Sequence, residues 1–270
     1  MDLSAAASIL AVNAALLAAG FLALWLLALA LRDVTFVDSV WAFGMGAMAL
    51  ATFVQVGEAT PRRLLLLGLC ALWAARLGGH LLLRWRAHGP DSRYESLIKD
   101  AKDRWGWSFP TASLLLVFAL QAPLLLIVCL PVQLGQLDAG AALGPLAWTG
   151  AALALFGVAF ETIGDAQLAR FRADPANRGK VLDTGLWKYT RHPNYFGDAC
   201  VWWGLFLIAA ETPLGVWALP GPILLTWTLT RWSGAPMLEE RLRQTRPEYA
   251  RYLRTTSGFI PWPPKREASM

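Results

Sequence analysis

"SAAASILAVNAALLAAGFLALWLLALAL", residues 4–31, is an apolar run without a single charged side chain. An α-helix needs about 20 apolar residues to cross the hydrocarbon core of a bilayer. The run is too long for the apolar core of a secretory signal peptide, and no basic segment precedes it. It therefore predicts a first membrane helix rather than a cleaved leader.

The composition and the repetition of such runs indicate a membrane protein. Hydrophobic residues make up 56% of the 270 residues and charged residues only 16%, whereas a soluble domain usually carries about 25% charged residues. Six further runs lie at about residues 35–56, 62–83, 111–131, 143–168, 196–211 and 214–232. We therefore predict an all-α, polytopic membrane protein with seven transmembrane helices in a single domain, residues 1–270.

The positive charges predict which side of the membrane each loop faces. Twenty of the 24 Lys and Arg residues lie within residues 84–110, 169–192 and 231–270. An even number of predicted spans separates these segments from one another, and cytoplasmic loops are rich in Lys and Arg. We expect all three segments and the C-terminus in the cytoplasm, and the N-terminus outside, with Arg62 and Arg63 on that outer face.

Two explanations of this positive charge stay open, contact with anionic lipid head groups and a pocket for a polyanionic ligand. Nucleic acid is not expected as a partner, because no reading motif is present and the basic residues flank predicted membrane helices. No obligate protein partner is evident. The cysteines Cys70, Cys129 and Cys200 lie in apolar runs without metal-binding spacing, so no metal site is predicted.

Five ionisable residues lie inside apolar runs, where charge is costly and usually paired or functional. They are Asp38, Arg76, Glu161, Asp165 and Asp198. Glu161 and Asp165 share one helical face, and so do Asn194 and Asp198, because each pair is four residues apart. These residues predict a polar cavity open to the cytoplasm. A structural ion-pair network, with Arg76 bound to Asp38 or Glu161, is the alternative.

Two cytoplasmic segments carry helix start signals. In "RHPNYFGD", residues 191–198, Pro193 favours a helix start, and the free backbone N–H groups that follow suit an anion. In the tail, Thr245 and Glu248 have the spacing of a capping box. Leucine and tyrosine residues alternate there with many arginines, which predicts amphipathic helix at the cytoplasmic membrane surface.

Five stretches together resemble one membrane enzyme family. They are "VDSVW" (37–41), "RWRAHGPDSRY" (84–94), "ETIGDAQLARFR" (161–172), "GLWKYTRHPNYFGD" (185–198) and "EERLRQTRPEYARYL" with "IPWPP" (239–253, 260–264). They are similar to the steroid 5α-reductase (3-oxo-5α-steroid 4-dehydrogenase) family, particularly its bacterial members. The resemblance implies a seven-helix fold in the bacterial inner membrane. It also implies NADPH bound from the cytoplasm and reduction of a conjugated carbon–carbon double bond in a steroid or similar isoprenoid-like lipid.

A second group shares part of this pattern. "RHPNY" followed by Glu239 and Glu240 also resembles the isoprenylcysteine carboxyl methyltransferases, which use S-adenosylmethionine. The reductases are favoured by the Asn194–Asp198 pair and by Asp165 and Arg172, which match reductase cofactor residues. The cations of residues 170–191 also suit the three phosphates of NADPH, whereas S-adenosylmethionine has none. No GxGxxG motif follows a strand pattern, so a Rossmann-type site is not expected.

The resemblance implies roles for particular residues. Asp38 matches the acid that polarises the ketone in the family, as a protonated donor. The third apolar run has no tyrosine to match the family's, so Tyr94 is the second catalytic candidate by its place beside the basic loop. Trp41 and Arg76 are substrate candidates. Residues 1–110 would mainly bind substrate and residues 111–270 mainly cofactor. The cofactor candidates are Arg93, Glu161, Asp165, Arg172, Lys180, Tyr189, Arg191, His192, Asn194, Tyr195, Asp198 and Glu239.

Overall fold

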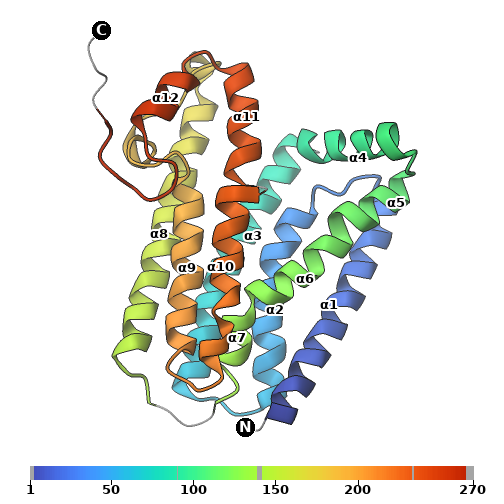
Figure 1. The fold of residues 1–270 in the computed structure, drawn as a ribbon, viewed down its shortest axis with the longest axis vertical. Helices are drawn as coiled ribbons and strands as arrows, with labels where there is room; N and C mark the ends of the chain where they lie inside the picture. Colours follow the sequence, from blue (N-terminus) through green and yellow to red (C-terminus); the bar gives the residue numbers. More distant parts are fainter. Residues whose placement is uncertain (1–2, 90, 139–141, 233, 266–270) are drawn as a thin grey trace. The chain divides into compact units, whose positions relative to one another are not determined.

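The structure, a computed structural model, describes residues 3–89, 91–138, 142–232 and 234–265, and helices joined by loops make up this part of the chain (Figure 1). The β-structure in these residues is one isolated bridge between Thr190 and Ser257. The predicted all-α class is therefore confirmed. The long helices are α1 (Leu3–Leu31), α2 (Val37–Val56), α3 (Pro61–His88), α4 (Ser92–Trp105), α8 (Pro145–Ala173) and α9 (Pro193–Ala209).

The remaining helices are short or interrupted. They are α5 (Phe109–Ser113), the π-turn η1 (Leu114–Phe118), α6 (Ala119–Val128), α7 (Leu130–Leu134), the short turns η2 (Pro175–Asn177), η3 (Gly185–Lys188) and η4 (Gly215–Ala218), α10 (Pro220–Trp227), the π-turn η5 (Thr228–Trp232), α11 (Ala235–Thr245) and α12 (Tyr249–Thr255).

Five helical segments in the described residues have the length and apolar composition of membrane spans. They are Leu3–Leu31, Val37–Val56, Pro61–Ala87, Phe109–Val128 and Pro145–Ala173. They coincide with the first five predicted runs, which supports a membrane protein. The sixth and seventh runs correspond to α9 and to α10 with η5, and their expected crossing of the membrane stays a prediction.

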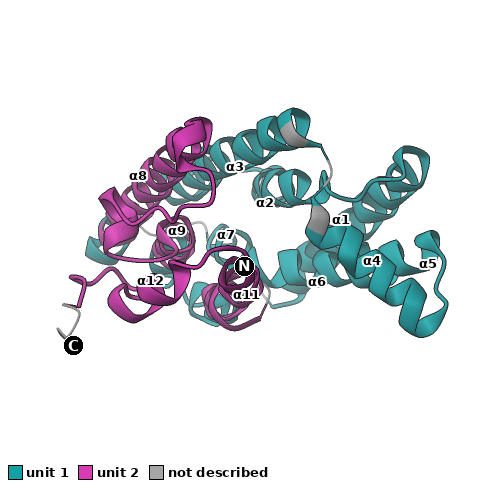
Figure 2. Ribbon diagram, turned by 90° about the horizontal axis from the view of Figure 1, so that it is seen from above, with its two compact units in different colours: residues 1–148, 205–221 teal, residues 149–204, 222–270 magenta. Residues whose placement is uncertain are grey.

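The chain divides into two compact units (Figure 2). Residues 1–148 and 205–221 form unit 1, and residues 149–204 and 222–270 form unit 2. In unit 1, α2 and α3 approach closely at small residues: a Cβ added to Gly46 would lie 3.1 Å from the Cβ of Ala74. Small residues allow such contacts between membrane helices. The division of roles expected at residue 110 stays a prediction.

Two adjacent arginines of unit 1, which the sequence placed on the outer face, are buried. Arg62 and Arg63 at the start of α3 are only 2% and 1% exposed. Arg62 donates to the carbonyl of Ile208 at 2.7 Å and pairs with Glu211 at 2.9 Å. Arg63 donates to the carbonyl of Gln136 at 2.7 Å. These bonds satisfy two buried cations and join the loops at one end of unit 1.

In unit 2, glycines bring α8 and α9 into close contact. A Cβ added to Gly157 would lie 2.5 Å from the carbonyl oxygen of Gly197, and one added to Gly204 would lie 2.5 Å from that of Gly150. The glycines of each helix are seven residues apart, about two helical turns, so they recur on one face. Gly197 also lies against the backbone and Cβ of Glu161, which places this acid in the helix contact.

The C-terminal region forms two helices, and the predicted capping box is wrong. Thr245 is the last residue of α11 rather than a cap, and its hydroxyl donates to the carbonyl of Arg241 at 2.9 Å. Glu248 precedes α12 without a side-chain cap bond. Arg246 is extended, at φ −133° and ψ 103°, because the residue before a proline disfavours helical geometry. Pro247 therefore separates α11 from α12.

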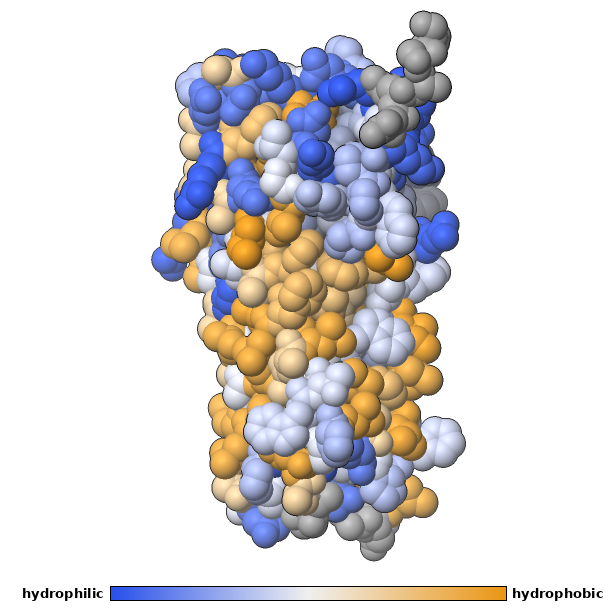
Figure 3. Space-filling view, turned by 90° about the vertical axis from the view of Figure 1, so that its left-hand side faces the viewer, coloured by the Kyte–Doolittle hydropathy of each residue, from blue (hydrophilic) through white to orange (hydrophobic). Residues whose placement is uncertain are grey.

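The surface is divided into apolar and polar zones. On the face drawn in Figure 3, hydrophobic side chains form a broad zone and hydrophilic side chains gather toward the upper end. Helix α8 exposes Leu155, Phe156 and Ile163. Contiguous exposed apolar surface of this kind is unfavourable in water and suits contact with lipid.

Candidate functional site

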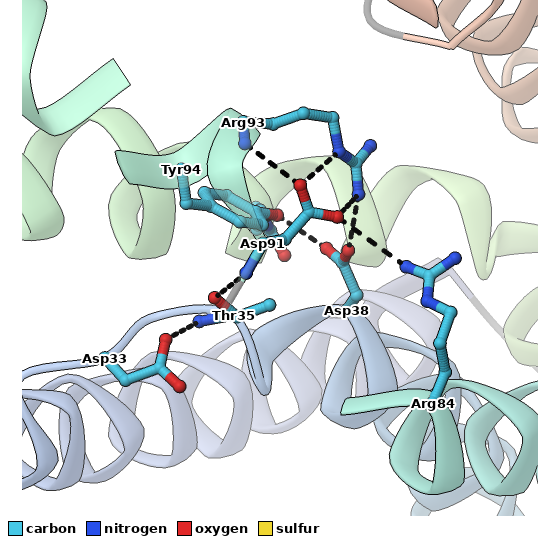
Figure 4. Close-up of polar contacts among 8 residues, drawn as sticks. Asp33, Thr35, Asp38, Arg84, Asp91, Arg93 and Tyr94 are labelled. Carbon is cyan, nitrogen blue, oxygen red and sulfur yellow. Dashed lines mark hydrogen bonds and ion pairs between the residues drawn. The ribbon is translucent and has the colours of Figure 1, made fainter. Parts of the chain in front are cut away.

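The first polar site lies in unit 1 and is called the Asp38 cluster: Asp38, Asp91, Arg93 and Tyr94 (Figure 4). Asp38 is in the first turn of α2. The Tyr94 hydroxyl donates to Oδ1 of Asp38 at 2.5 Å, and Nη2 of Arg93 donates to Oδ2 at 3.2 Å. The Asp38 side chain remains 24% exposed. Both carboxylate oxygens are thus held from α4, and the site stays accessible.

Asp91 positions the two α4 residues. It is the N-cap of α4 and accepts the backbone N–H of Arg93 at 2.9 Å, as polar N-cap residues commonly do. Its two oxygens also bind Nε and Nη2 of Arg93 at 3.1 and 2.9 Å, a bidentate pair. Arg84 of α3 approaches Asp91 at 3.9 Å. Asp91 therefore fixes the position of the Arg93 guanidinium, which also bonds to Asp38.

The connection between α1 and α2 holds the start of α4. The Asp91 backbone N–H donates to Oγ1 of Thr35 at 3.0 Å, and the Thr35 N–H donates to Oδ1 of Asp33 at 2.8 Å. Oδ2 of Asp33 accepts the indole N–H of Trp85 at 2.8 Å. Three segments are joined in this way around Asp38. In Figure 1, α4 lies transverse to α1, α2 and α3.

Burial and charge set the protonation behaviour of the α4 residues. Burial, and then the charge and hydrogen bond of Asp38, raise the pKa of Tyr94 well above its usual value. Burial alone would raise the pKa of Asp91, but its hydrogen bonds from Arg93 hold it below the ordinary range. Burial alone would lower the pKa of Arg93, but Asp91 and Asp38 raise it. Tyr94 is therefore a neutral phenol, and the Asp91–Arg93 pair is ionised at neutral pH.

Sequence reasoning missed one member of this neighbourhood. Gln121 of α6 donates to the Tyr94 hydroxyl oxygen at 3.3 Å. It follows the π-turn η1, and such turns are often found at functional sites. A polar residue inside the apolar run 111–131 was the available signal. Trp41 lies one turn beyond Asp38 on α2, and Arg76 lies on α3.

The second polar site lies in unit 2 and is called the Glu239 cluster: Arg191, His192 and Glu239. Oε1 of Glu239 accepts Nε of Arg191 at 2.8 Å and lies 2.9 Å from Nε2 of His192. Arg191 also donates to the carbonyl of Thr256 at 2.6 Å. The His192 ring stacks on Tyr195, with centroids 5.2 Å apart. Burial alone would raise the pKa of Glu239, but its bonds to His192 and Arg191 lower it to about 2.

A cavity of about 750 Å³ opens beside the Glu239 cluster. Its lining residues are Arg191, Thr226, Thr230, Arg231, Ala235, Pro236, Glu239, Glu240, Arg243 and residues 257–260. Arg191 and Glu239 were predicted cofactor residues. Arg231 and Arg243 were not among the predicted cofactor residues, although both belong to the basic segment 231–270. The lining carries three arginines and two glutamates, and Glu239 pairs with Arg191. The guanidinium groups of Arg231 and Arg243 suit the charged groups of a large anionic ligand.

The other predicted cofactor residues of unit 2 lie outside this lining. Glu161, Asp165 and Asp198 are buried on α8 and α9, with exposed fractions of 2%, 7% and 6%. Arg172 is in the last turn of α8, and Asn194 is in the first turn of α9. Lys180 accepts a hydrogen bond from Arg246 at its carbonyl, and Tyr189 is 42% exposed. Arg93, also predicted for the cofactor, is a member of the Asp38 cluster, and its cofactor role stays a prediction.

The described residues contain no group of three or more His, Cys, Asp and Glu side chains arranged to hold a metal ion. The three cysteines are buried and free.

Comparison with known proteins indicates the family. Residues 24–256 match the family described as "Protein of unknown function (DUF1295)". An uncharacterized protein of Schizosaccharomyces pombe is 23% identical over 235 residues, an alignment that covers 78% of this chain and 65% of the relative. The chain thus spans slightly less than two thirds of that protein. No solved structure matches the chain. Because the match covers most of its length, the chain belongs to the DUF1295 family, a membrane-protein family related to the steroid 5α-reductases.

Proposed function

We propose that this protein is an NADPH-dependent reductase of the conjugated carbon–carbon double bond in a 3-oxo-4-ene steroid or a similar lipid enone. The proposal includes seven transmembrane helices in a bacterial inner membrane, an outer N-terminus and an active site open to the cytoplasm. It rests on the sequence resemblance and on one observation, the hydrogen-bonded pair of Tyr94 and Asp38.

The Tyr94–Asp38 pair suits polarisation of a ketone. Addition of a hydride to the β-carbon of an enone moves an electron pair onto the ketone oxygen, and a donor placed there lowers the barrier. The raised pKa of Tyr94 keeps its proton available at neutral pH. A ketone oxygen that enters beside Tyr94 takes the one phenol hydrogen bond in place of Oδ1 of Asp38 as negative charge develops on the ketone. The α-carbon then takes a proton from water, which releases hydroxide and gives the saturated ketone.

The geometry favours Tyr94 over Asp38 as the donor. Asp38 accepts hydrogen bonds from both Tyr94 and Arg93 in the structure, whereas the expected role required Asp38 to donate. In the proposed mechanism Asp38 orients the phenol, and Arg93 balances the charge of Asp38. Gln121 donates to the same phenol oxygen, which stabilises any negative charge that Tyr94 develops as it shares its proton.

The residues around the unit 2 cavity fit NADPH. This cofactor carries a pyrophosphate and a third phosphate, and Arg191, Arg231 and Arg243 line a cavity of about 750 Å³. Charge-assisted bonds from guanidinium groups hold phosphates well. Glu239 fixes the orientation of Arg191 through a 2.8 Å bond. When bound, NADPH supplies the hydride. Methyl transfer from S-adenosylmethionine requires no phosphate-binding cations.

The test is a titration of the purified protein with NADPH and with S-adenosylmethionine, followed by single-turnover oxidation of bound NADPH with testosterone or progesterone. We expect NADPH to bind and to be consumed by the enone. Arg231→Gln with Arg243→Gln should weaken NADPH binding, whereas Arg254→Gln, an exposed α12 residue outside the cavity lining, should not. Binding of S-adenosylmethionine in place of NADPH would support the methyltransferase alternative instead.

A further inference from the structure

A rigid strap closes the C-terminal part of unit 2. We use this name for residues 256–265, which follow α12 and run back along residues 189–191. The bonds that hold it are Arg191 N–H to Ser257 O (2.9 Å), Thr190 Oγ1 to Phe259 O (2.8 Å), Trp262 N–H to Tyr189 O (2.9 Å) and Lys265 N–H to Thr255 O (2.8 Å). The strap therefore holds a defined conformation without being a helix or a strand.

A small basic pocket lies at the end of the strap. Its volume is about 270 Å³, and it is lined by Asp183, Lys188, Arg251, Thr255, Thr256, Pro264 and Lys265. The pocket is distinct from the larger cavity, with which it shares no lining residue. It is smaller than most cavities that bind drug-sized molecules. A single phosphate group with part of its ester substituent suits this space.

The pocket carries more positive than negative charge. Asp183 pairs with Arg251 at 3.1 Å. Among the residues that the structure describes, no carboxylate lies within ion-pair distance of Lys188 or Lys265, and both are exposed. The Thr255 hydroxyl donates to a backbone carbonyl of its own helix, and its oxygen is available as an acceptor. Two ammonium groups and one shared guanidinium therefore converge on an anion-sized space.

Two large apolar side chains project from the same strap. Ile260, which also lines the larger cavity, is 64% exposed, and Trp262 is 68% exposed. Hydrogen bonds hold the backbone of both residues. Tryptophan is enriched at the membrane–water interface, where its apolar ring and polar N–H both find suitable surroundings. A fixed, exposed Trp–Ile pair next to a basic pocket has the chemistry of a membrane-surface contact.

We propose that the strap is an anchoring site for anionic phospholipid. Ile260 and Trp262 enter the interface, and the lipid phosphate binds between Lys188, Arg251 and Lys265. The position along the chain supports this assignment, because residues 174–188 directly follow α8, which has the length and composition of a membrane span. A soluble phosphate would satisfy the cations but would leave the two apolar side chains exposed to water.

The test uses the purified full chain in detergent with phosphatidylglycerol or phosphatidylcholine of identical acyl chains, and bound lipid is measured by native mass spectrometry. We expect the wild type to retain phosphatidylglycerol preferentially. Lys188→Gln with Lys265→Gln should weaken that binding about 30-fold, which corresponds to about 1 kcal/mol per lysine. The matched control is Lys99→Gln with Lys102→Gln, two exposed lysines of α4, and it should bind as the wild type does.

A second measurement separates a lipid from a free anion. Inorganic phosphate in excess should not displace phosphatidylglycerol, and brominated phosphatidylglycerol should quench the part of the tryptophan fluorescence that Trp262→Tyr removes. The proposal is overturned if the double variant keeps wild-type lipid binding or if the α4 control loses as much. Displacement by inorganic phosphate, or absence of quenching at Trp262, would also overturn it.

Discussion

Tyr94 donates a 2.5 Å hydrogen bond to Oδ1 of Asp38, which joins the first turn of α4 to the first turn of α2. Oxygen–oxygen distances this short are typical of hydrogen bonds in which one partner is charged. The neighbouring Arg93 occupies the other carboxylate oxygen at 3.2 Å. Asp38 thus fixes the direction of the Tyr94 hydroxyl. In the proposed reductase, Tyr94 is the hydrogen-bond donor to the ketone, and Asp38 is the residue that orients it.

Replacement of Tyr94 tests the donor. Tyr94→Phe removes the hydroxyl and keeps the ring, so we expect the chemical step to slow about 100- to 1000-fold, as for loss of one oxyanion donor. The affinity for NADPH should stay unchanged. Single-turnover kinetics with a 3-oxo-4-ene steroid measure the first quantity, and fluorescence titration measures the second. Gln121→Leu should have a smaller effect, because Gln121 contacts only the phenol oxygen, at 3.3 Å. An unchanged rate in Tyr94→Phe contradicts the assignment.

Replacement of Asp38 tests the residue that orients the phenol. Asp38→Asn keeps an oxygen that accepts from Tyr94, so some activity should remain. Asp38→Leu removes every acceptor and should cost about 2–4 kcal/mol in the chemical step. The same single-turnover assay compares the two variants. If Asp38→Leu reduces the enone at the wild-type rate, Asp38 serves only to bind Arg93 and Tyr94.

Asn194 and Asp198 test the cofactor side. They lie one helical turn apart at the start of α9, and Asp198 is 6% exposed. Asn194→Ala and Asp198→Ala should each weaken NADPH binding by about 1–3 kcal/mol through lost hydrogen bonds. Circular dichroism should show an unchanged helical content. Wild-type affinity in both variants would remove these two residues from the cofactor site.

Glu239 predicts a pH dependence of stability. Its pKa is lowered to about 2 from 4.5 by the bonds to His192 and Arg191 that outweigh its burial. A carboxylate with a lowered pKa stabilises the folded state fully above pH 4.5, and this contribution is lost as the pH falls toward 2. Glu239→Gln should therefore reduce stability by about 2 kcal/mol at pH 7, and the difference from the wild type should shrink below pH 4.5. Thermal unfolding in detergent, recorded at several pH values, measures this difference, and a difference independent of pH contradicts the prediction.

Glu211 and Glu58, which pair with the neighbouring Arg62 and Arg63, allow a buried ion pair to be compared with an exposed one. Arg62 and Glu211 are 2% and 13% exposed, whereas the Glu58 partner of Arg63 is 66% exposed. Glu211→Gln leaves a buried cation without its counter-charge, and we expect a loss of about 3 kcal/mol of unfolding free energy. Glu58→Gln should cost less than about 1 kcal/mol, as surface pairs do. Thermal midpoints of the two variants in the same detergent compare them directly, and equal midpoints would show that Arg62 does not depend on Glu211.

The sequence by itself determined the helical class and the existence of polar sites. Apolar runs and their period decide helix formation locally. Each of the seven predicted runs is occupied by helix in the described residues, and α4, α11 and α12 lie outside the runs. Asp38 and Tyr94 were both recognisable as unusual: one is an acid inside an apolar run, and the other adjoins a basic loop. The role of Asp38 relied on the resemblance to the reductases, and Tyr94 was chosen for its place beside the basic loop. Side-chain chemistry alone does not identify a partner 56 residues away.

Only the tertiary structure decided which polar groups meet. Arg93 was predicted to bind the cofactor, and the Asp91 cap at the start of α4 directs its guanidinium to Asp38, a contact that the sequence did not predict. Arg62 was expected on the outer face, and the structure buries it, because the carbonyls of Ile208 and Ala142 together with Glu211 satisfy its guanidinium. Pro247 separates α11 from α12. Residues 257–260, which follow α12, line the larger cavity together with Arg231 and Arg243. In each case the deciding contact lies far along the chain, and its energy depends on burial and geometry that local sequence patterns do not contain.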